Sequence, residues 1–394
     1  AFENAVTQDG LISVMRHGFK HRGINFRVCY FKPESELNEL ANEHYKQNVC
    51  QCIRQWHYTE ANRNSIDMML AVNGIPVVAI ELKNQLTGQS VDDAMRQWEY
   101  NRNPKEYAFG FNKRVLAYFA CDLYNVYMTT QLNGAETVFL PFNQGSNGAG
   151  KDGGAGNPTT EDGKYVTSYF WENVLQKDKL LDILQKFISY ERSEKKKIMP
   201  DGSTKTTVSS KVIFPRYHQL DVVRKLVSHV RENGAGHNYL IQHSAGSGKS
   251  NSIAWTAYRM ASLHDENNNP IFDSVIIVTD RRVLDQQLQA TVSGFDHTLG
   301  SVVTIDEKKN SGDLRDAIND GKRIIISTLQ KFPVIYDEVH SSVGKHYAVI
   351  VDEAHSSQTG QSALKLKAAL ADVSDALQEY AELEEKAVEE IEKN

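Results

Sequence analysis

A loop containing two glycines, Gly246 and Gly248, has the residue types that bind a nucleoside triphosphate. The glycines let backbone N–H groups turn towards a chain of phosphates, Lys249 can reach the β- and γ-phosphates, and the Ser250 hydroxyl can ligate magnesium. The strict motif has glycine where this chain has His243, so the alternative is a glycine-rich turn that binds nothing. We predict that the residues contacting ATP are Gly246, Ser247, Gly248, Lys249 and Ser250.

Two carboxylates that follow an apolar run support this nucleotide site. Residues 347–351 are all aliphatic or aromatic, as in a buried strand, and Asp352 and Glu353 come directly after them. At the carboxyl end of such a strand, about a hundred residues beyond the loop, Asp352 suits a magnesium ligand and Glu353 a base that activates water. The sequence therefore predicts a site for ATP with Mg²⁺.

Asp67, Glu81 and Lys83 form a second set of residues suited to catalysis. Two carboxylates can hold magnesium through hard oxygens, and a lysine beside them can assist an attacking water, which is the chemistry of phosphodiester hydrolysis. The alternative is a surface salt bridge on a sheet, because an acid two residues from a lysine is common. The apolar run 77–80 favours the catalytic interpretation, since burying charges among such residues is costly.

The three residues come together only if two strands pair in one register. The chain from residue 65 to residue 83 reads as two strands joined at Asn73–Gly74, a hairpin turn sequence. A two-residue loop would set Asp67 opposite Ile80, on the wrong face, whereas a three-residue loop would set Asp67 opposite Glu81. We therefore predict a longer or bulged turn.

The surrounding elements predict two α/β domains. A helix over 91–100 and further strands near 115–120 and 125–129 predict a small mixed sheet within residues 1–190. Downstream, apolar strand candidates alternate with helical stretches, which predicts a parallel sheet that binds ligands at the carboxyl ends of its strands. These strand candidates are residues 239–242, 274–279, 302–305, 323–327 and 347–351.

Composition shifts predict the boundaries between these parts. Residues 191–212 are charged and polar and are predicted to be a linker, so that the second domain covers 213–370 and an acidic helical tail covers 371–394. The glycine-rich run 145–163 lacks a strand and helix around it, and we predict a loop there, with a phosphate-binding loop as the alternative.

Charge and cysteine content exclude several classes of protein. The net charge is −6 at pH 7, but residues 372–394 alone carry −7, so the charge of the remainder neither supports nor excludes DNA binding. The four cysteines lack C-x-x-C spacing, which argues against a disulfide framework or a zinc site. No run approaches the roughly 18 apolar residues of a membrane span, and we predict a cytoplasmic protein.

Taken together, the motifs resemble those of a known family. The glycine loop and Asp352–His355, with matching stretches at 214–219, 278–281 and 327–331, look like the first RecA-like motor lobe of superfamily 2 helicases. With the Asp67, Glu81 and Lys83 set before it, the arrangement over residues 1–370 resembles the motor and nuclease subunit, the R subunit, of type I restriction-modification enzymes.

This resemblance implies roles for the matching residues. Asp67 and Glu81 would bind the catalytic metal of a PD-(D/E)xK-type nuclease, and Lys83 would orient or activate water. Gln219 would read the adenine of ATP. The resemblance also implies double-stranded DNA as the substrate, and methyltransferase and specificity subunits as partners, with ATP-driven translocation coupled to cleavage.

The chain departs from the family pattern at two points. The family's nuclease has a Q-x-x-x-Y motif after the lysine, whereas Gln97 and Tyr100 are one residue too close. No second motor lobe follows Asp352, and we therefore predict an N-terminal fragment that binds ATP without running as a motor. Two alternatives remain open: a repair or remodelling helicase whose N-terminal domain only binds DNA, and a scaffold that uses nucleotide binding to dock partners.

Overall fold

The computed structural model describes two compact units, Ala1–Asp221 and Val222–Asn394, and each is considered by itself. The residues described are 1–33, 38–160, 164–198, 204–244, 246–279, 288, 291–292, 302–305, 309–328 and 345–352. Among these residues, no helix combines the length and the hydropathy that crossing a membrane requires.

The first unit is built on a six-stranded sheet with the order β3-β4-β5-β6-β7-β8. The strands are β3 (Cys50–His57), β4 (Ser65–Val72), β5 (Ile75–Leu82), β6 (Ala117–Cys121), β7 (Val126–Thr129) and β8 (Leu140–Pro141). The sheet is mixed, because β5 and β6 are parallel while the other neighbouring pairs are antiparallel. A parallel pair requires a crossover, and the chain between β5 and β6 supplies it through α4 (Val91–Tyr100).

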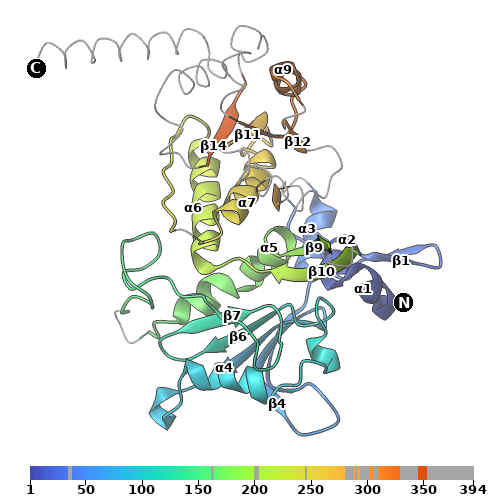
Figure 1. Cartoon of the computed structure of the whole chain (residues 1–394), viewed down its shortest axis with the longest axis vertical. Coiled ribbons are helices and arrows are strands. Elements are labelled where there is room, and N and C mark those ends of the chain that lie inside the picture. Colours follow the sequence, from blue (N-terminus) through green and yellow to red (C-terminus); the bar gives the residue numbers. More distant parts are fainter. Residues whose placement is uncertain are drawn as a thin grey trace, which may run out of the picture. The chain divides into compact units, whose positions relative to one another are not determined.

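Helix α4 covers one face of this sheet and contacts β5, β6 and β7 (Figure 1). Its N-terminus is fixed by a capping box between Ser90 and Asp93. On its inner side Trp98 is fully buried, packs edge-on against Tyr118 and donates its indole N–H to the carbonyl oxygen of Phe119 over 3.0 Å. This contact fixes α4 to the strand beside β5.

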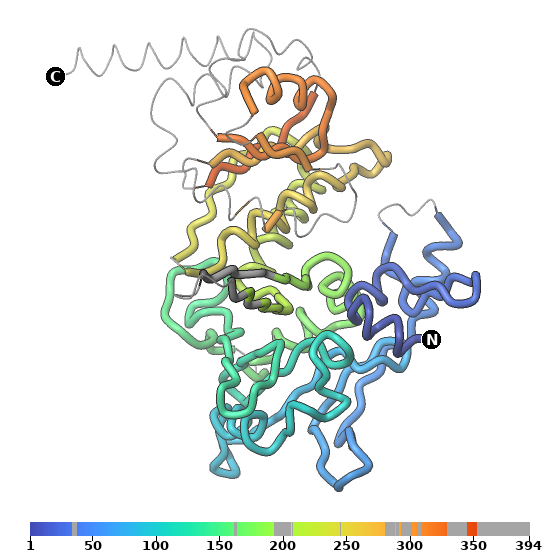
Figure 2. Tube along the Cα trace, turned by 45° about the vertical axis from the view of Figure 1, so that its right-hand side comes forward, coloured from blue at the N-terminus to red at the C-terminus, as the bar shows by residue number. Residues whose placement is uncertain are grey.

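The other face of the sheet is covered by aromatic side chains. Side chains alternate along a strand, so Phe119 points away from α4. Its ring lies 4.7 Å from that of Phe170 and 5.7 Å from that of Phe214, measured between centroids. Strand β6, one of the sheet strands coloured light blue to green in Figure 2, is therefore buried along its whole length.

The remaining elements of the first unit flank the sheet. They are α1 (Phe2–Asp9), α2 (Leu11–His17), β1 (Phe19–His21), β2 (Ile24–Phe26), α3 (Glu39–Lys46), the short turns η1 (Gln85–Thr87) and η2 (Tyr107–Phe109), the π-helical turn η3 (Phe170–Val174) and α5 (Lys177–Lys186). The stretch predicted as a linker forms an antiparallel hairpin instead, in which β9 (Ser189–Ile198) pairs with β10 (Thr204–Ile213) along its whole length. Helix α6 (Tyr217–Asn233) follows, and the division between the units falls within it.

The second unit contains a four-stranded sheet in which every pair of neighbours is parallel. In the order β12-β13-β11-β14, its strands are β12 (Val302–Thr304), β13 (Ile324–Thr328), β11 (Ser274–Thr279) and β14 (Tyr347–Val351). Helix α7 (Lys249–Ala261) contacts three of these strands, and α9 (Ser311–Asn319) contacts β13. The predicted fold class, a mixed-sheet domain followed by a parallel-sheet RecA-like lobe, is confirmed.

One predicted strand of the second unit is absent. Residues 239–242 have no strand conformation, and the Leu240 side chain is 87% exposed. A strand requires a hydrogen-bonded neighbour, and no described residue pairs with this segment. The apolar pattern alone therefore overestimated the local structure before the glycine loop.

Candidate functional site

The hairpin of β4 and β5 sets the geometry of the first candidate site. Asn73 and Gly74 both have positive φ, 51° and 81°, and Val72 pairs with Ile75. This is a two-residue turn, so the predicted three-residue loop is wrong. A bulge after Leu70 shifts the register, however, so that Met68 pairs with Ile80. The predicted bulge is thus confirmed, although it lies within the strands rather than in the turn.

The shifted register brings Asp67 next to the end of β5. Its Oδ2 accepts a hydrogen bond from the backbone N–H of Leu82 over 2.8 Å, and its Oδ1 accepts one from the Gln55 side chain over 3.1 Å. Gln55 has φ of 50°, which is uncommon for a residue other than glycine, and it is left out of the pairing between β3 and β4. Asp67 is therefore held from both neighbouring strands.

Glu81 on β5 is completely buried and paired with an arginine that the sequence did not reveal. Arg102 is 5% exposed and directs its Nε and Nη2 to the same oxygen, Glu81 Oε1, over 3.0 and 2.6 Å. Nη2 also donates to the carbonyl oxygen of Ser65 over 2.7 Å. The sequence offered one signal, namely a basic residue two positions beyond a helix that covers the site.

The other carboxylate oxygen of Glu81 is not used by the arginine. Glu81 Oε2 is buried and has no hydrogen-bond partner among the described residues. Burial raises the pKa of Glu81 to about 7, the Asp67 charge adds to this increase, and the charge of Arg102 opposes it. The two carboxylates are thus close enough for their negative charges to repel each other. Arg102 binds Oε1 of Glu81 and leaves Oε2 without a hydrogen bond to its guanidinium group.

Lys83 directly follows β5 and contacts helix α4. Its Nζ donates to the side-chain oxygen of Gln97 over 2.5 Å, and its backbone N–H donates to the carbonyl oxygen of Cys121 over 2.9 Å. Tyr100, by contrast, is 69% exposed. The structure therefore brings Gln97 to the lysine and leaves Tyr100 on the surface.

These groups fit a divalent cation of the magnesium type. Asp67 and Glu81 supply hard carboxylate oxygens, and the buried, unpartnered Oε2 of Glu81 is an acceptor that a cation would satisfy. The described residues contain no cluster of three or more His, Cys, Asp or Glu suited to a metal. Magnesium binds through one or two carboxylates with water and substrate phosphates, so two carboxylates are sufficient.

The glycine loop forms the second candidate site and leads into α7. Gly246 and Gly248 have φ of 72° and 84°, conformations that glycine adopts without strain. Lys249 and Ser250 are the first residues of the helix, so the backbone N–H groups of its first turn face the loop. This is the arrangement that binds phosphate at a helix N-terminus.

Of the other residues predicted to bind the nucleotide, the structure describes Asp352 and Gln219. Asp352 lies at the carboxyl end of β14, where its backbone N–H donates to the carbonyl oxygen of Val278 over 3.0 Å. Gln219 is buried in the first turn of α6, and its Oε1 accepts from the backbone N–H of Arg216 over 2.9 Å. Glu353 lies outside the described residues.

Comparisons with known proteins agree with this two-part arrangement. Residues 26–143 match the family model for the N terminus of the type I restriction enzyme R protein, and residues 218–375 match the model for the SWI2/SNF2 ATPase. The chain is therefore similar to a restriction-enzyme R protein in its first unit and to a SWI2/SNF2 ATPase further along.

Two relatives have names that agree with this combination. A type I restriction enzyme HindI endonuclease subunit from Haemophilus influenzae is 25% identical over 69% of this chain, and a putative type I restriction enzyme MjaVIIIP endonuclease subunit from Methanocaldococcus jannaschii is 26% identical over 58%. These alignments cover only 24% and 20% of the relatives' own lengths. Over these stretches the chain is similar to the endonuclease subunits of type I restriction enzymes.

Proposed function

We propose that the chain contributes the metal-dependent nuclease centre and an ATP-binding motor lobe to a type I restriction endonuclease. The observation that carries the proposal is the position of Asp67, Glu81 and Lys83 at one end of the β4–β5 hairpin, with a buried carboxylate oxygen left unpartnered. The relatives are named as restriction enzyme endonuclease subunits, and the substrate that we propose for this chain is double-stranded DNA. Methyltransferase and specificity subunits would complete the complex, which would act in the cytoplasm.

In the proposed reaction each residue of the first site has a separate task. Asp67 and Glu81 Oε2 would hold Mg²⁺, and Arg102 would keep Glu81 in place by occupying its other oxygen. The ion would supply Lewis-acid polarisation of the phosphodiester group. Lys83, held by Gln97, would orient the attacking water or stabilise the charge that develops on the phosphate.

The second site would bind ATP with magnesium. Lys249 and the first N–H groups of α7 would contact the phosphates, and Ser250 and Asp352 would hold the ion. Glu353 would activate the hydrolytic water, and Gln219 would recognise adenine. Such a lobe would take part in ATP-driven movement along DNA.

A cleavage assay on the assembled complex tests the proposal. With ATP, Mg²⁺ and duplex DNA, Glu81→Gln and Lys83→Ala should each abolish cleavage, because one removes a metal ligand and the other removes the cation beside the water. Asp92→Asn, a change at an exposed acid on α4, should leave cleavage unchanged. Cleavage by the Glu81→Gln complex at the unchanged rate would refute the nuclease assignment.

A further inference from the structure

A hairpin near the N-terminus concentrates positive charge on a chain that is negative overall. Between Gly10 and Pro33 the sequence has five Lys and Arg residues and two His residues but no Asp or Glu, whereas the whole chain carries −6. The β1–β2 hairpin, residues 19–26, lies in the middle of this segment. A local excess of positive charge on a surface is typical of a region that binds a polyanion.

The base of the hairpin is fixed to the helices before it. Phe19 and Phe26 stack with ring centroids 5.2 Å apart, and Arg27 Nη1 donates to the carbonyl oxygen of Arg16 over 2.7 Å. Gly18 has φ of 74°, and a Cβ at this position would come within 2.1 Å of the carbonyl oxygen of Phe26. The hairpin therefore leaves helix α2 at a defined position.

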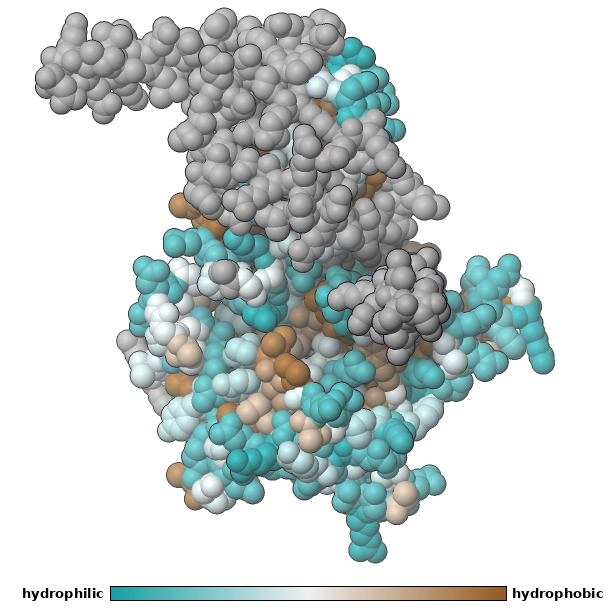
Figure 3. Space-filling view, in the orientation of Figure 1, coloured by the Kyte–Doolittle hydropathy of each residue, from teal (hydrophilic) through white to brown (hydrophobic). Residues whose placement is uncertain are grey.

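The remainder of the hairpin is exposed and carries the charges. All residues from 20 to 27 are exposed, and Ile24 at the turn is 61% exposed. Within the described part of the chain, Lys20, Arg22 and Arg27 form no salt bridge. Figure 1 shows the hairpin extending away from the sheet, and Figure 3 shows a largely hydrophilic surface at the same place. An isolated two-stranded ribbon is only marginally stable in water. The hairpin is therefore positioned by the contacts of Phe19, Phe26 and Arg27 at its base.

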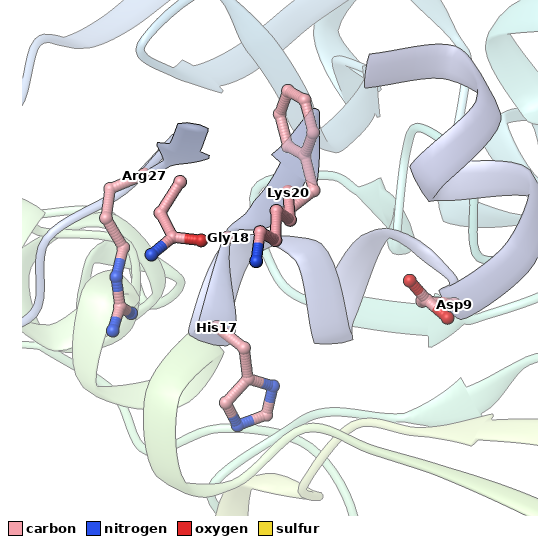
Figure 4. Close-up of a pocket in the computed structure, with 7 residues that line it drawn as sticks. Asp9, His17, Gly18, Lys20 and Arg27 are labelled. Carbon is pink, nitrogen blue, oxygen red and sulfur yellow. The ribbon is translucent and has the colours of Figure 1, made fainter. Parts of the chain in front are cut away.

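A cavity of about 440 Å³ lies where the hairpin meets helix α2. Its charged lining is mainly basic: Lys20 and Arg27 contribute, and Asp9 is the acidic member. Figure 4 shows Asp9 on the side of the cavity away from Arg27, with Gly18 between them. The cavity therefore has a basic side that can receive a phosphate group.

We infer that the β1–β2 hairpin and its cavity bind the phosphate backbone of duplex DNA. The inference rests on the proposed function, because duplex DNA is the polyanion on which such a nuclease would act. When exposed cations without acidic partners among the described residues neutralise phosphates, the counterions condensed on the nucleic acid are released, and this favours a polyanion over an ordinary protein surface. The match to the R-protein family model begins at residue 26, so it includes only the last residue of this hairpin.

Duplex binding by neutralised variants tests the inference. Lys20→Gln, Arg22→Asn and Arg27→Gln are combined in one protein; asparagine is chosen because residue 22 has φ of 48°, which asparagine tolerates. Binding of a 30-base-pair duplex to the full chain is measured in EDTA over a range of salt concentrations. The control combines Lys105→Gln, Lys113→Gln and Lys164→Gln, three exposed lysines elsewhere in the same unit with the same change of charge.

The expected result has two parts. The hairpin variant should lose at least about tenfold in affinity, and the slope of log K against log salt should become shallower by about 2 to 3, because each lost phosphate contact removes about 0.9. Both changes should be equal for two unrelated duplex sequences, since backbone contacts carry no sequence information. The control variant should keep most of the affinity. Equal losses in the hairpin and control variants would overturn the inference.

A second measurement covers the case in which the hairpin variant is misfolded. A photo-crosslinking amino acid at Ile24, in an otherwise unchanged chain, should crosslink to the bound duplex, and failure to crosslink while the duplex is bound would also overturn the inference. These assays contain no metal and do not depend on cleavage. Loss of cleavage in the Glu81→Gln complex is thus a separate outcome, and either assignment can fail while the other stands.

Discussion

Glu81 is a fully buried acidic residue in the proposed nuclease site. Its side chain is fully buried, yet it carries a carboxylate that meets Arg102 on one oxygen and, among the described residues, has no hydrogen-bond partner on the other. A buried ion pair is costly to desolvate and contributes little stability relative to apolar residues. Retaining such a pair beside a second carboxylate is consistent with a catalytic rather than a structural role, since stability alone does not require it.

Removing the arginine should destabilise the first unit strongly. Arg102→Ala leaves the Glu81 charge buried without its cation, and we expect the free energy of unfolding to fall by about 3 to 5 kcal/mol, as for other broken buried pairs. The loss should be smaller below pH 7, where Glu81 can take up a proton. Urea denaturation monitored by circular dichroism, carried out above and below pH 7, measures the loss of unfolding free energy under both conditions.

Arg96→Ala provides the matched control on the same helix. Its partner Asp93 is 3.9 Å away, and both side chains are well exposed. Exposed pairs of this kind contribute about 0 to 1 kcal/mol, so the change should be small. If Arg102→Ala cost no more than Arg96→Ala, the buried pair would not be formed in solution.

The raised pKa of Glu81 predicts how metal binding depends on pH. Burial raises this pKa to about 7, so below that pH the metal-free carboxyl is protonated and the proton competes with the ion. Affinity for Mg²⁺ should therefore fall about tenfold for each pH unit below 7 and become constant above it. Calorimetric titrations between about pH 5.5 and pH 8 provide the measurement, and an affinity independent of pH would contradict it.

At the scale of elements, the β4–β5 hairpin depends on its two-residue turn. Gly74 has φ of 81°, and a Cβ there would meet no atom within 4 Å, so Gly74→Ala introduces backbone strain without a steric clash. We expect a loss of about 1 to 2 kcal/mol in unfolding free energy. Gly110→Ala, at a position without a positive φ, should cost less. Equal costs for the two variants would mean that the turn is not held in this conformation.

This hairpin also shows what the sequence could predict and what it could not. Apolar runs on both sides of Asn73–Gly74 identified both strands, and the requirement that Asp67 reach Glu81 indicated a bulge. The position of the bulge was not predictable, because the run 75–80 is apolar without interruption and favours no single site for an extra residue. The sequence thus predicted that Asp67 lies opposite Glu81, but it did not predict that a bulge within the strands produces this register.

Elements that depend on distant partners were predicted less well. Arg102 contacts a residue 21 positions away across a crossover helix, a pairing that no local spacing reveals. The stretch 191–212 looked like a linker because charged and polar residues dominate it, yet its backbone pairs along β9 and β10. Backbone hydrogen bonds, unlike a hydrophobic core, leave little trace in composition.

At the scale of the whole molecule, the proposed nuclease residues and the glycine loop belong to different compact units. Asp67, Glu81 and Lys83 lie in Ala1–Asp221, and the glycine loop lies in Val222–Asn394. Sites without shared partners usually respond independently to mutation. Lys249→Ala should therefore weaken ATP binding by about ten- to a hundredfold, as expected for a lost charge-assisted hydrogen bond, and leave Mg²⁺ binding at the first site unchanged.

The reciprocal variant completes this comparison. Glu81→Ala should remove Mg²⁺ binding at the first site and leave ATP affinity unchanged. Calorimetry measures the Mg²⁺ affinity and the ATP affinity of both variants. Lys322→Ala, an exposed lysine in the second unit, is the control for the loss of one positive charge. Unchanged ATP affinity in Lys249→Ala would show that the glycine loop does not bind the nucleotide as proposed.

The position of a bound metal ion tests the central claim most directly. Crystals of the chain soaked in Mn²⁺, which replaces magnesium and gives an anomalous signal, should show one peak between the Asp67 carboxylate and Glu81 Oε2. We expect distances near the roughly 2.1 Å typical of magnesium-type ligation, with Lys83 beside the ion and no peak in Glu81→Ala crystals. A peak that avoids both carboxylates, or none at millimolar Mn²⁺, would contradict the assignment of this site as a metal-dependent nuclease centre.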